Sequence, residues 1–193
     1  MLKIAIVGPE SSGKTSLAEA LMVHYHGGYI SEVSREYLEG IERPYEEHDL
    51  LEITRSIEEL HAGAEDVVRE HEAAISGQQP EQMERIRRPV FYDTDTLNIR
   101  IWSQEKYGRV HPEIDRSVQE TRYTWRLLCR PDIPWEPDPF RENPHDRDRL
   151  FEVWQRELKA LSLPYTIIEG THEQRMRTAT NLVDVLIQGH SIP

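Results

Sequence analysis

Short apolar runs alternate with amphipathic stretches along most of this chain. Five of these runs show little polar alternation, which is typical of strands buried on both faces of a parallel sheet. The predicted strands are Lys3–Val7, Gly28–Ser31, Pro89–Tyr92, Thr124–Cys129 and Tyr165–Ile168. Strands that alternate with helices indicate a three-layer α/β fold, with about five parallel strands covered by helices.

Most segments between the strands carry apolar residues at helical spacing. From about Glu46 to Ile75 this spacing predicts one long amphipathic helix or two shorter ones, and Ser76–Arg88 is expected to be loop at least in part. The other predicted helices are about Ser16–Tyr25, Thr96–Lys106, Pro112–Glu120, Asp146–Leu161 and a last helix from a cap at Thr171 to about Ile187.

The segment Arg130–Asp146 is predicted to be irregular, because its five prolines exclude a regular helix or a central strand. A long ordered loop in a compact domain is usually functional and is often a lid. The length of 193 residues suits one well-buried domain. We therefore expect a single domain over residues 1–193 with a Pro-rich lid near 130–149.

The stretch Gly-Pro-Glu-Ser-Ser-Gly-Lys-Thr at residues 8–15 fits the phosphate-binding loop of nucleoside-triphosphate enzymes. A predicted strand precedes it and a predicted helix follows it, as this motif requires. Backbone N–H groups of such a loop surround an anion, Lys14 reaches the β- and γ-phosphates, and Thr15 ligates Mg²⁺. The expected nucleotide contacts are Gly8, Pro9, Glu10, Ser11, Ser12, Gly13, Lys14, Thr15 and Ser16. A Gly/Ser-rich turn without a ligand is the alternative.

Ligands of parallel α/β sheets bind beyond the carboxyl ends of the strands. This rule places five predicted loops at one edge of the sheet, so that residues far apart in the sequence converge on one cleft. The loops are Gly8–Thr15, Glu32–Tyr37, Asp93–Asp95, Arg130–Asp146 and Glu169–Thr171.

Two carboxylates follow the third predicted strand. Asp93 stands where a phosphate-loop enzyme keeps its acidic partner, and it would ligate Mg²⁺ through water or orient the attacking hydroxyl. Asp95 is close enough to share this task or to contact the substrate. It equally suits the N-cap of the next helix, because it directly precedes Thr96 and Leu97.

Arg35, Glu36 and Tyr37 place a cation, an anion and an aromatic ring beside the phosphate loop. Glu36 would hold a small polyhydroxyl substrate, and the ring of that substrate would stack on Tyr37. A surface salt-bridge cluster at the start of a helix explains the same three residues equally well.

The Pro-rich segment supplies further candidates. Arg141 lies deepest in it and would neutralise the charge that develops on the γ-phosphate. Trp135 would pack on an aromatic ligand or anchor the segment on its own protein. Arg149 follows in the next predicted helix, where it also suits a simple pair with Asp146.

Charge and composition narrow the class of protein. The net charge of −12 argues against a non-specific binder of nucleic acid or of an anionic membrane. The one cysteine, Cys129, excludes an internal disulfide framework and is expected to be a buried thiol. No apolar run reaches the length of a membrane span, and the chain opens on a strand rather than a signal peptide, so we expect a cytoplasmic protein. No feature indicates an oligomeric state.

With these motifs the chain resembles the nicotinamide riboside kinase domain of the bacterial NadR family, over essentially its whole length outside Ser76–Arg88. The resemblance implies a P-loop kinase of NAD biosynthesis that uses ATP and Mg²⁺ to phosphorylate the 5′-hydroxyl of nicotinamide riboside, giving nicotinamide mononucleotide. Because the chain begins with the first strand, we expect neither the adenylyltransferase nor the DNA-binding part of some NadR proteins. The motifs that carry the resemblance are Gly-x-Glu-Ser-Ser-Gly-Lys-Thr at 8–15, Ser-Arg-Glu-Tyr at 34–37, Asp-Thr-Asp-Thr at 93–96, the segment Tyr107–His111, the strand ending at Cys129, and Ile133-Pro134-Trp135 with Asp138 and Arg141.

Two alternatives remain open from the sequence. One is a kinase of the same fold that acts on another nucleoside or small metabolite. The other is an ATPase or regulatory nucleotide-binding module without a small acceptor. A GTP switch is disfavoured, because the chain lacks the guanine-reading Asn-Lys-x-Asp motif.

Overall fold

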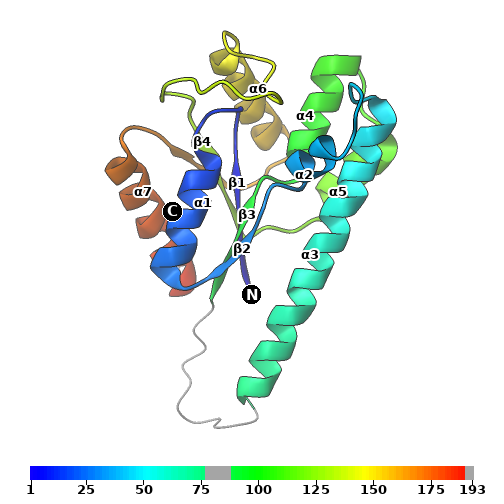
Figure 1. Ribbon diagram of the computed structural model, residues 1–193. Helices are drawn as coiled ribbons and strands as arrows, with labels where there is room; N and C mark the ends of the chain where they lie inside the picture. Colours follow the sequence, from blue (N-terminus) through cyan, green and yellow to red (C-terminus); the bar gives the residue numbers. More distant parts are fainter. Residues whose placement is uncertain (77–87, 190–193) are drawn as a thin grey trace.

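A computed structural model of the protein describes residues 1–76 and 88–189 (Figure 1). The part of the expected loop at 77–87 lies outside these residues. Within the described residues, no helix is both long and apolar enough to cross a membrane.

A five-stranded parallel sheet forms the centre of the molecule, in the order β2-β3-β1-β4-β5. The central strand β1 pairs with β3 and β4, so that Ile4 lies opposite Phe91 on one side and Trp125 on the other. The strands are β1 (Leu2–Val7), β2 (Gly28–Ile30), β3 (Pro89–Asp93), β4 (Trp125–Cys129) and β5 (Tyr165–Ile168). The predicted parallel α/β sheet is confirmed.

Helices fill the connections between the strands, and each predicted helix is present. The stretch for which one or two helices were expected is the single 30-residue helix α3. The helices are α1 (Lys14–Tyr25), α2 (Val33–Glu39), α3 (Glu47–Ser76), α4 (Thr96–Tyr107), α5 (Pro112–Glu120), α6 (Arg147–Ala160) and α7 (His172–Ile187). The segment 130–146 has neither helix nor strand, as its prolines predict.

One expectation about the backbone was wrong. The stretch Glu32–Tyr37 was predicted to be a loop, but most of it belongs to the short helix α2. Its N-cap, Glu32, makes no side-chain capping hydrogen bond, and the helix is only seven residues long. The sequence offers no capping side chain here, and the acidic Glu36 in the first turn is a weak signal for the start of the helix.

The two faces of the sheet carry separate cores, which makes three layers (Figure 1). Side chains alternate along β1, so that Ile4 packs with Leu21 of α1 and Val183 of α7, whereas Ala5 packs on the opposite face with Trp154 of α6. Helices α2, α3, α4 and α5 share a third cluster beside the sheet.

A buried histidine connects α3 to the sheet. His61 is 6% exposed, its ring meets Tyr92 edge-on at 4.5 Å between centroids, and its Nδ1 lies 3.1 Å from the Tyr123 hydroxyl. Burial, aided by the charge of Lys3, lowers the pKa of His61 from its ordinary value of 6.5 to about 4.

This shift predicts a loss of stability at mildly acidic pH. The unfolded chain binds a proton at His61 below about pH 6.5 and the folded chain does not, so stability falls as pH decreases from there toward about 4. Between about pH 7 and pH 5, the free energy of unfolding should fall by about 2 kcal/mol more in the wild type than in His61→Phe. Urea unfolding of both proteins at each pH measures this, and parallel pH profiles would contradict it.

Candidate phosphate-binding site and cleft

Loops from four strands meet at the carboxyl edge of the sheet, as the sequence predicts. The Thr15 hydroxyl, after β1, donates to Asp93 Oδ2 at the end of β3 over 2.6 Å. The backbone N–H of Glu136, after β4, donates to Ser11 Oγ over 3.1 Å. The N–H of Gly170, after β5, donates to Asp132 over 2.7 Å. Residues from the whole length of the chain therefore surround one site.

The backbone of the phosphate loop requires its glycines. Gly8 has a φ of 137°, and a Cβ atom there would lie 2.6 Å from the carbonyl oxygen of Cys129. Gly13 has a φ of 81° and caps the start of α1. The Lys14 ammonium donates to the Pro9 carbonyl over 2.9 Å, which keeps it within the curve of the loop. The loop and the N-terminus of α1 thus form an anion-binding concavity with a cation inside it.

A buried arginine of α7 fixes this loop to two strand ends. Arg175 is 5% exposed and donates to the carbonyls of Ser12 over 2.9 Å, Arg130 over 2.7 Å and Gly170 over 2.9 Å. The same guanidinium also pairs with Asp132. Sequence reasoning missed Arg175, because no local pattern distinguishes it from the other arginines of its helix.

Asp93 combines burial with one unused oxygen. It is 3% exposed, and Oδ2 accepts the Thr15 hydroxyl. The Tyr29 hydroxyl is close enough to favour the ionised carboxylate, but Oδ1 accepts no hydrogen bond of good geometry from the described residues. Burial raises the pKa of Asp93, and the nearby Lys14 charge opposes the rise. The Thr15 hydroxyl and Asp93 Oδ1 are hard oxygen ligands, which Mg²⁺ prefers. The residues present therefore fit the implied ion.

The structure gives Asp95 two structural partners. Its Oδ1 accepts the backbone N–H of Leu97 over 3.1 Å, which confirms the helix-cap interpretation. Its Oδ2 pairs with Arg126 of β4 over 2.9 Å, and the two side chains are only 1% and 2% exposed. Asp95 does not line the cleft, so its suggested contact with substrate stays a prediction that this geometry disfavours.

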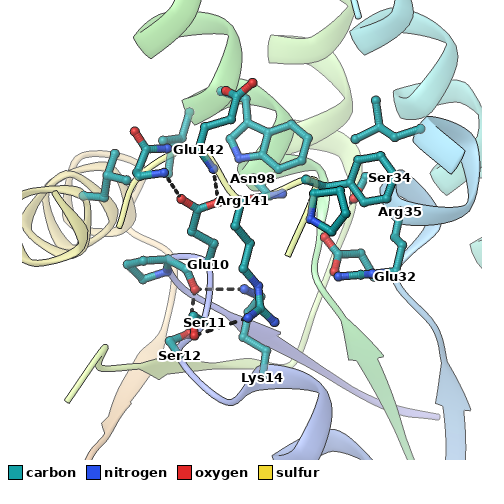
Figure 2. A pocket seen from close by; sticks show the side chains of 18 of the residues that line it. Glu10, Ser11, Ser12, Lys14, Glu32, Ser34, Arg35, Asn98, Arg141 and Glu142 are labelled. Atoms are coloured by element: carbon teal, nitrogen blue, oxygen red, sulfur yellow. Dashed lines mark hydrogen bonds between the residues drawn. The ribbon is translucent and has the colours of Figure 1, made fainter. Parts of the chain in front are cut away.

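A cleft of about 700 Å³ extends from the phosphate loop between α2, α4 and the segment 133–143 (Figure 2). Its volume lies within the range of about 300–1,000 Å³ that is usual for small-molecule sites. One wall is aromatic, with the Tyr45 and Trp102 rings 6.2 Å apart and Phe140 nearby. Polar groups of Glu32, Ser34 and Asn98 also line the cleft. Phosphate loop and cleft are therefore one continuous site.

Only some of the substrate-binding candidates lie in this wall. Arg35 lines the cleft and pairs with Asp138 over 2.6 Å, and its contact with substrate stays a prediction. Glu36 is exposed on α2, and the Tyr37 hydroxyl donates to the buried Asp49 over 2.9 Å instead. Neither residue is part of the cleft lining. The aromatic wall therefore does not contain Tyr37, which the sequence suggested for stacking on the substrate.

The candidate residues in and after the Pro-rich segment also differ in whether they line the cleft. Arg141 lines the cleft, and its side chain extends toward Ser11 and Lys14 (Figure 2). Trp135 is not in the lining, and its ring lies 6.0 Å from the Arg141 guanidinium and 5.5 Å from that of Arg147. Arg149 pairs with Asp146, as expected, but it also lines the cleft.

Sequence reasoning missed one face of α4. Asn98, Trp102 and Glu105 all line the cleft, at the i, i+4 and i+7 spacing of one helix face. Polar and aromatic residues on a helix that begins beside the Asp93 loop are the signal that would have found them. Glu32 was likewise overlooked, although it directly follows the second strand.

The cations of the cleft differ in whether a carboxylate neutralises them. Arg35, Arg43 and Arg149 each pair with an acidic side chain. Lys106 lies over the Tyr45 ring, with its ammonium 3.3 Å from the ring centroid, and makes no ion pair with a described residue. Among the described residues, Lys14 and Arg141 likewise make no ion pair, and they donate to neutral oxygens at the phosphate loop. These two cations are therefore available to an anionic ligand at the phosphate loop.

A parallel sheet whose first strand leads through such a loop into a helix defines a P-loop nucleoside-triphosphate-binding protein. Residues 3–175 match the family model AAA_28, described as an AAA domain. The chain belongs to this family. No curated protein matches it.

Solved structures show the same fold. NadR in complex with NR has a TM-score of 0.72, and NadR in complex with NAD and AMP-PNP has a TM-score of 0.70, each at 18% identity over 100% of this chain. The match covers 53% and 51% of those NadR chains, so this chain spans about half their length. Deoxyadenosine kinase from M. mycoides, solved with product nucleotides, matches with a TM-score of 0.62 at 9% identity, over 95% of this chain and 99% of that one. The NadR resemblance is confirmed for the fold, which is of the P-loop kinase type.

Proposed function

We propose that this protein is an ATP-dependent kinase that phosphorylates the 5′-hydroxyl of nicotinamide riboside to give nicotinamide mononucleotide. The observation that carries the proposal is the cleft of about 700 Å³, which joins two unpaired cations at the phosphate loop to an aromatic wall. A nucleoside base can stack on this wall while its 5′-hydroxyl faces the phosphates. The fold shared with NadR bound to NR supports nicotinamide riboside as the nucleoside.

In the proposed reaction, the 5′-hydroxyl oxygen bonds to the γ-phosphorus as the bond to the bridging oxygen breaks and ADP leaves. Lys14 and the loop N–H groups hold the phosphates, and Arg141 neutralises the charge on the γ-phosphoryl oxygens. Asp93 orients the hydroxyl and takes its proton, a role that its raised pKa favours. Thr15 and Asp93 would hold Mg²⁺, which neutralises phosphate charge when bound.

The position of the cleft also separates the two substrates. The acceptor cleft lies on the α2 and α4 side of the phosphate loop. The nucleoside part of ATP must then extend to the other side, toward Asp132 and Gly170 at the ends of β4 and β5. Segment 133–143, which contributes Arg141, lies across the loop between them and serves as the proposed lid.

ADP release from MgATP, measured with and without nicotinamide riboside and joined to mass spectrometry of the product, tests the proposal. We expect ADP and nicotinamide mononucleotide in equal amounts, and neither with Lys14→Met. If only another nucleoside from a parallel panel stimulated ADP release, the protein would still be a kinase, but nicotinamide riboside would be rejected as its substrate. Acceptor-independent hydrolysis would support the ATPase instead.

A further inference from the structure

One side chain of the phosphate loop points away from the anion site. The Glu10 carboxylate accepts the backbone N–H of Glu142 over 3.1 Å and also that of Asn143 (Figure 2). Both amides belong to the Pro-rich segment, more than 130 residues further along the chain. Glu10 was expected to contact the nucleotide, but its charge is already engaged with this segment.

The two amides lie next to Arg141, the residue that reaches the phosphate loop. Arg141 immediately precedes them in the sequence, and its Nη1 donates to Ser11 Oγ over 3.4 Å and to the Glu136 carbonyl. Among the described residues it has no carboxylate partner that would fix it. Its place over the loop therefore depends on these two hydrogen bonds to neutral oxygens and on the backbone that carries it.

Electrostatics also favours a Glu10 side chain that contacts the Pro-rich segment and not the nucleotide. An uncompensated carboxylate beside a triphosphate would repel it. Hydrogen bonds from two backbone N–H groups hold the Glu10 carboxylate toward the Pro-rich segment and away from the phosphates. If the side chain at position 10 had no function beyond avoiding the phosphates, a neutral residue would serve as well as Glu10.

We propose that Glu10 is a positioning residue that binds the backbone at 142–143 and thereby holds Arg141 over the phosphate loop. The inference rests on the proposed phosphoryl transfer, in which Arg141 contacts the γ-phosphate. The proposal gives a role to Glu10, the third residue of the phosphate loop, whose charge is not explained by phosphate binding.

Two measurements on Glu10→Gln test this role, with Glu152→Gln on the exposed face of α6 as the matched control. The amide keeps the shape but places an NH₂ group against one of the two N–H donors. We expect kcat to fall about tenfold with the KM for ATP changed less than about threefold, because the lost contact acts through Arg141 in the transition state. In Glu10→Gln/Arg141→Met, kcat should be no lower than in Arg141→Met alone.

The second measurement needs no turnover. Hydrogen exchange in a peptide covering 138–146 should become about tenfold faster in Glu10→Gln than in the wild type and the control. Unchanged exchange would overturn the proposal, even if no nucleoside proved to be a substrate. A raised KM for ATP at unchanged kcat would overturn it too, because Glu10 would then contact the nucleotide. Additive losses in the double variant would contradict action through Arg141.

Discussion

Asp93→Asn should bind ATP almost as well as the wild type and turn over about 10²–10⁴-fold more slowly. Asparagine has the same shape, and its carbonyl oxygen can still accept the Thr15 hydroxyl that now lies 2.6 Å from Oδ2. It cannot accept the substrate proton, and it removes the negative charge from the magnesium site. Calorimetric titration with a non-hydrolysable ATP analogue, beside single-turnover phosphoryl transfer, measures the two effects separately.

The matched variant for this experiment is Glu32→Gln, since Glu32 is a carboxylate of the cleft wall, whereas the buried Asp93 is not part of the cleft lining. If Asp93 is the base, the wild-type rate should fall as pH drops through its raised pKa, and this acid limb should disappear in Asp93→Asn alone. Near-normal turnover of Asp93→Asn would remove Asp93 from the mechanism, and loss of the limb in Glu32→Gln would assign proton transfer to Glu32.

Arg126→Met should destabilise the protein by about 3–5 kcal/mol. Arg126 and Asp95 form an ion pair in which both side chains are almost inaccessible to water. Removal of the guanidinium leaves the Asp95 carboxylate buried with only the α4 cap as a partner. Urea unfolding at neutral pH measures the loss.

A double variant separates the buried charge from the change in packing. Arg126→Met/Asp95→Asn keeps a capping side chain on α4 and leaves no unpaired charge, so it should recover about 2 kcal/mol of the loss. A double variant as unstable as Arg126→Met would show that packing, not charge, dominates. A loss below about 1 kcal/mol in the single variant would contradict the ion pair itself.

The parts that the sequence predicted depend on local chemistry. The Gly8–Thr15 loop has its pattern and its strand and helix in adjacent residues, and Asp95 is recognisable as a cap because it directly precedes Thr96 and Leu97. The rule for parallel sheets then brought Asp93 and Arg141 to the same edge. Each of these steps needs only short-range patterns and one rule of topology.

The features of the candidate site that the sequence did not predict depend on tertiary packing. Tyr37 turns from the cleft because its partner, Asp49, is brought beside it by the start of α3. Asn98 and Trp102 face the cleft only because of the rotation of α4 about its axis, which the packing of its apolar side against the sheet decides. The contact of Tyr37 with Asp49 leaves no trace in the neighbouring sequence, whereas the polar and aromatic positions on one face of α4 are a weak signal that becomes informative only once the cleft is known.

The buried guanidinium of Arg175 has a mechanical consequence. Because it ties carbonyls of Ser12, Arg130 and Gly170 together, the phosphate loop and the ends of β4 and β5 behave as one rigid body. Any closing motion around a substrate must then come from the other side, where Arg35 links α2 to Asp138. The anion site is thus the fixed part of the cleft, and α2 would move toward it and toward the Pro-rich segment, which Glu10 already holds against the phosphate loop.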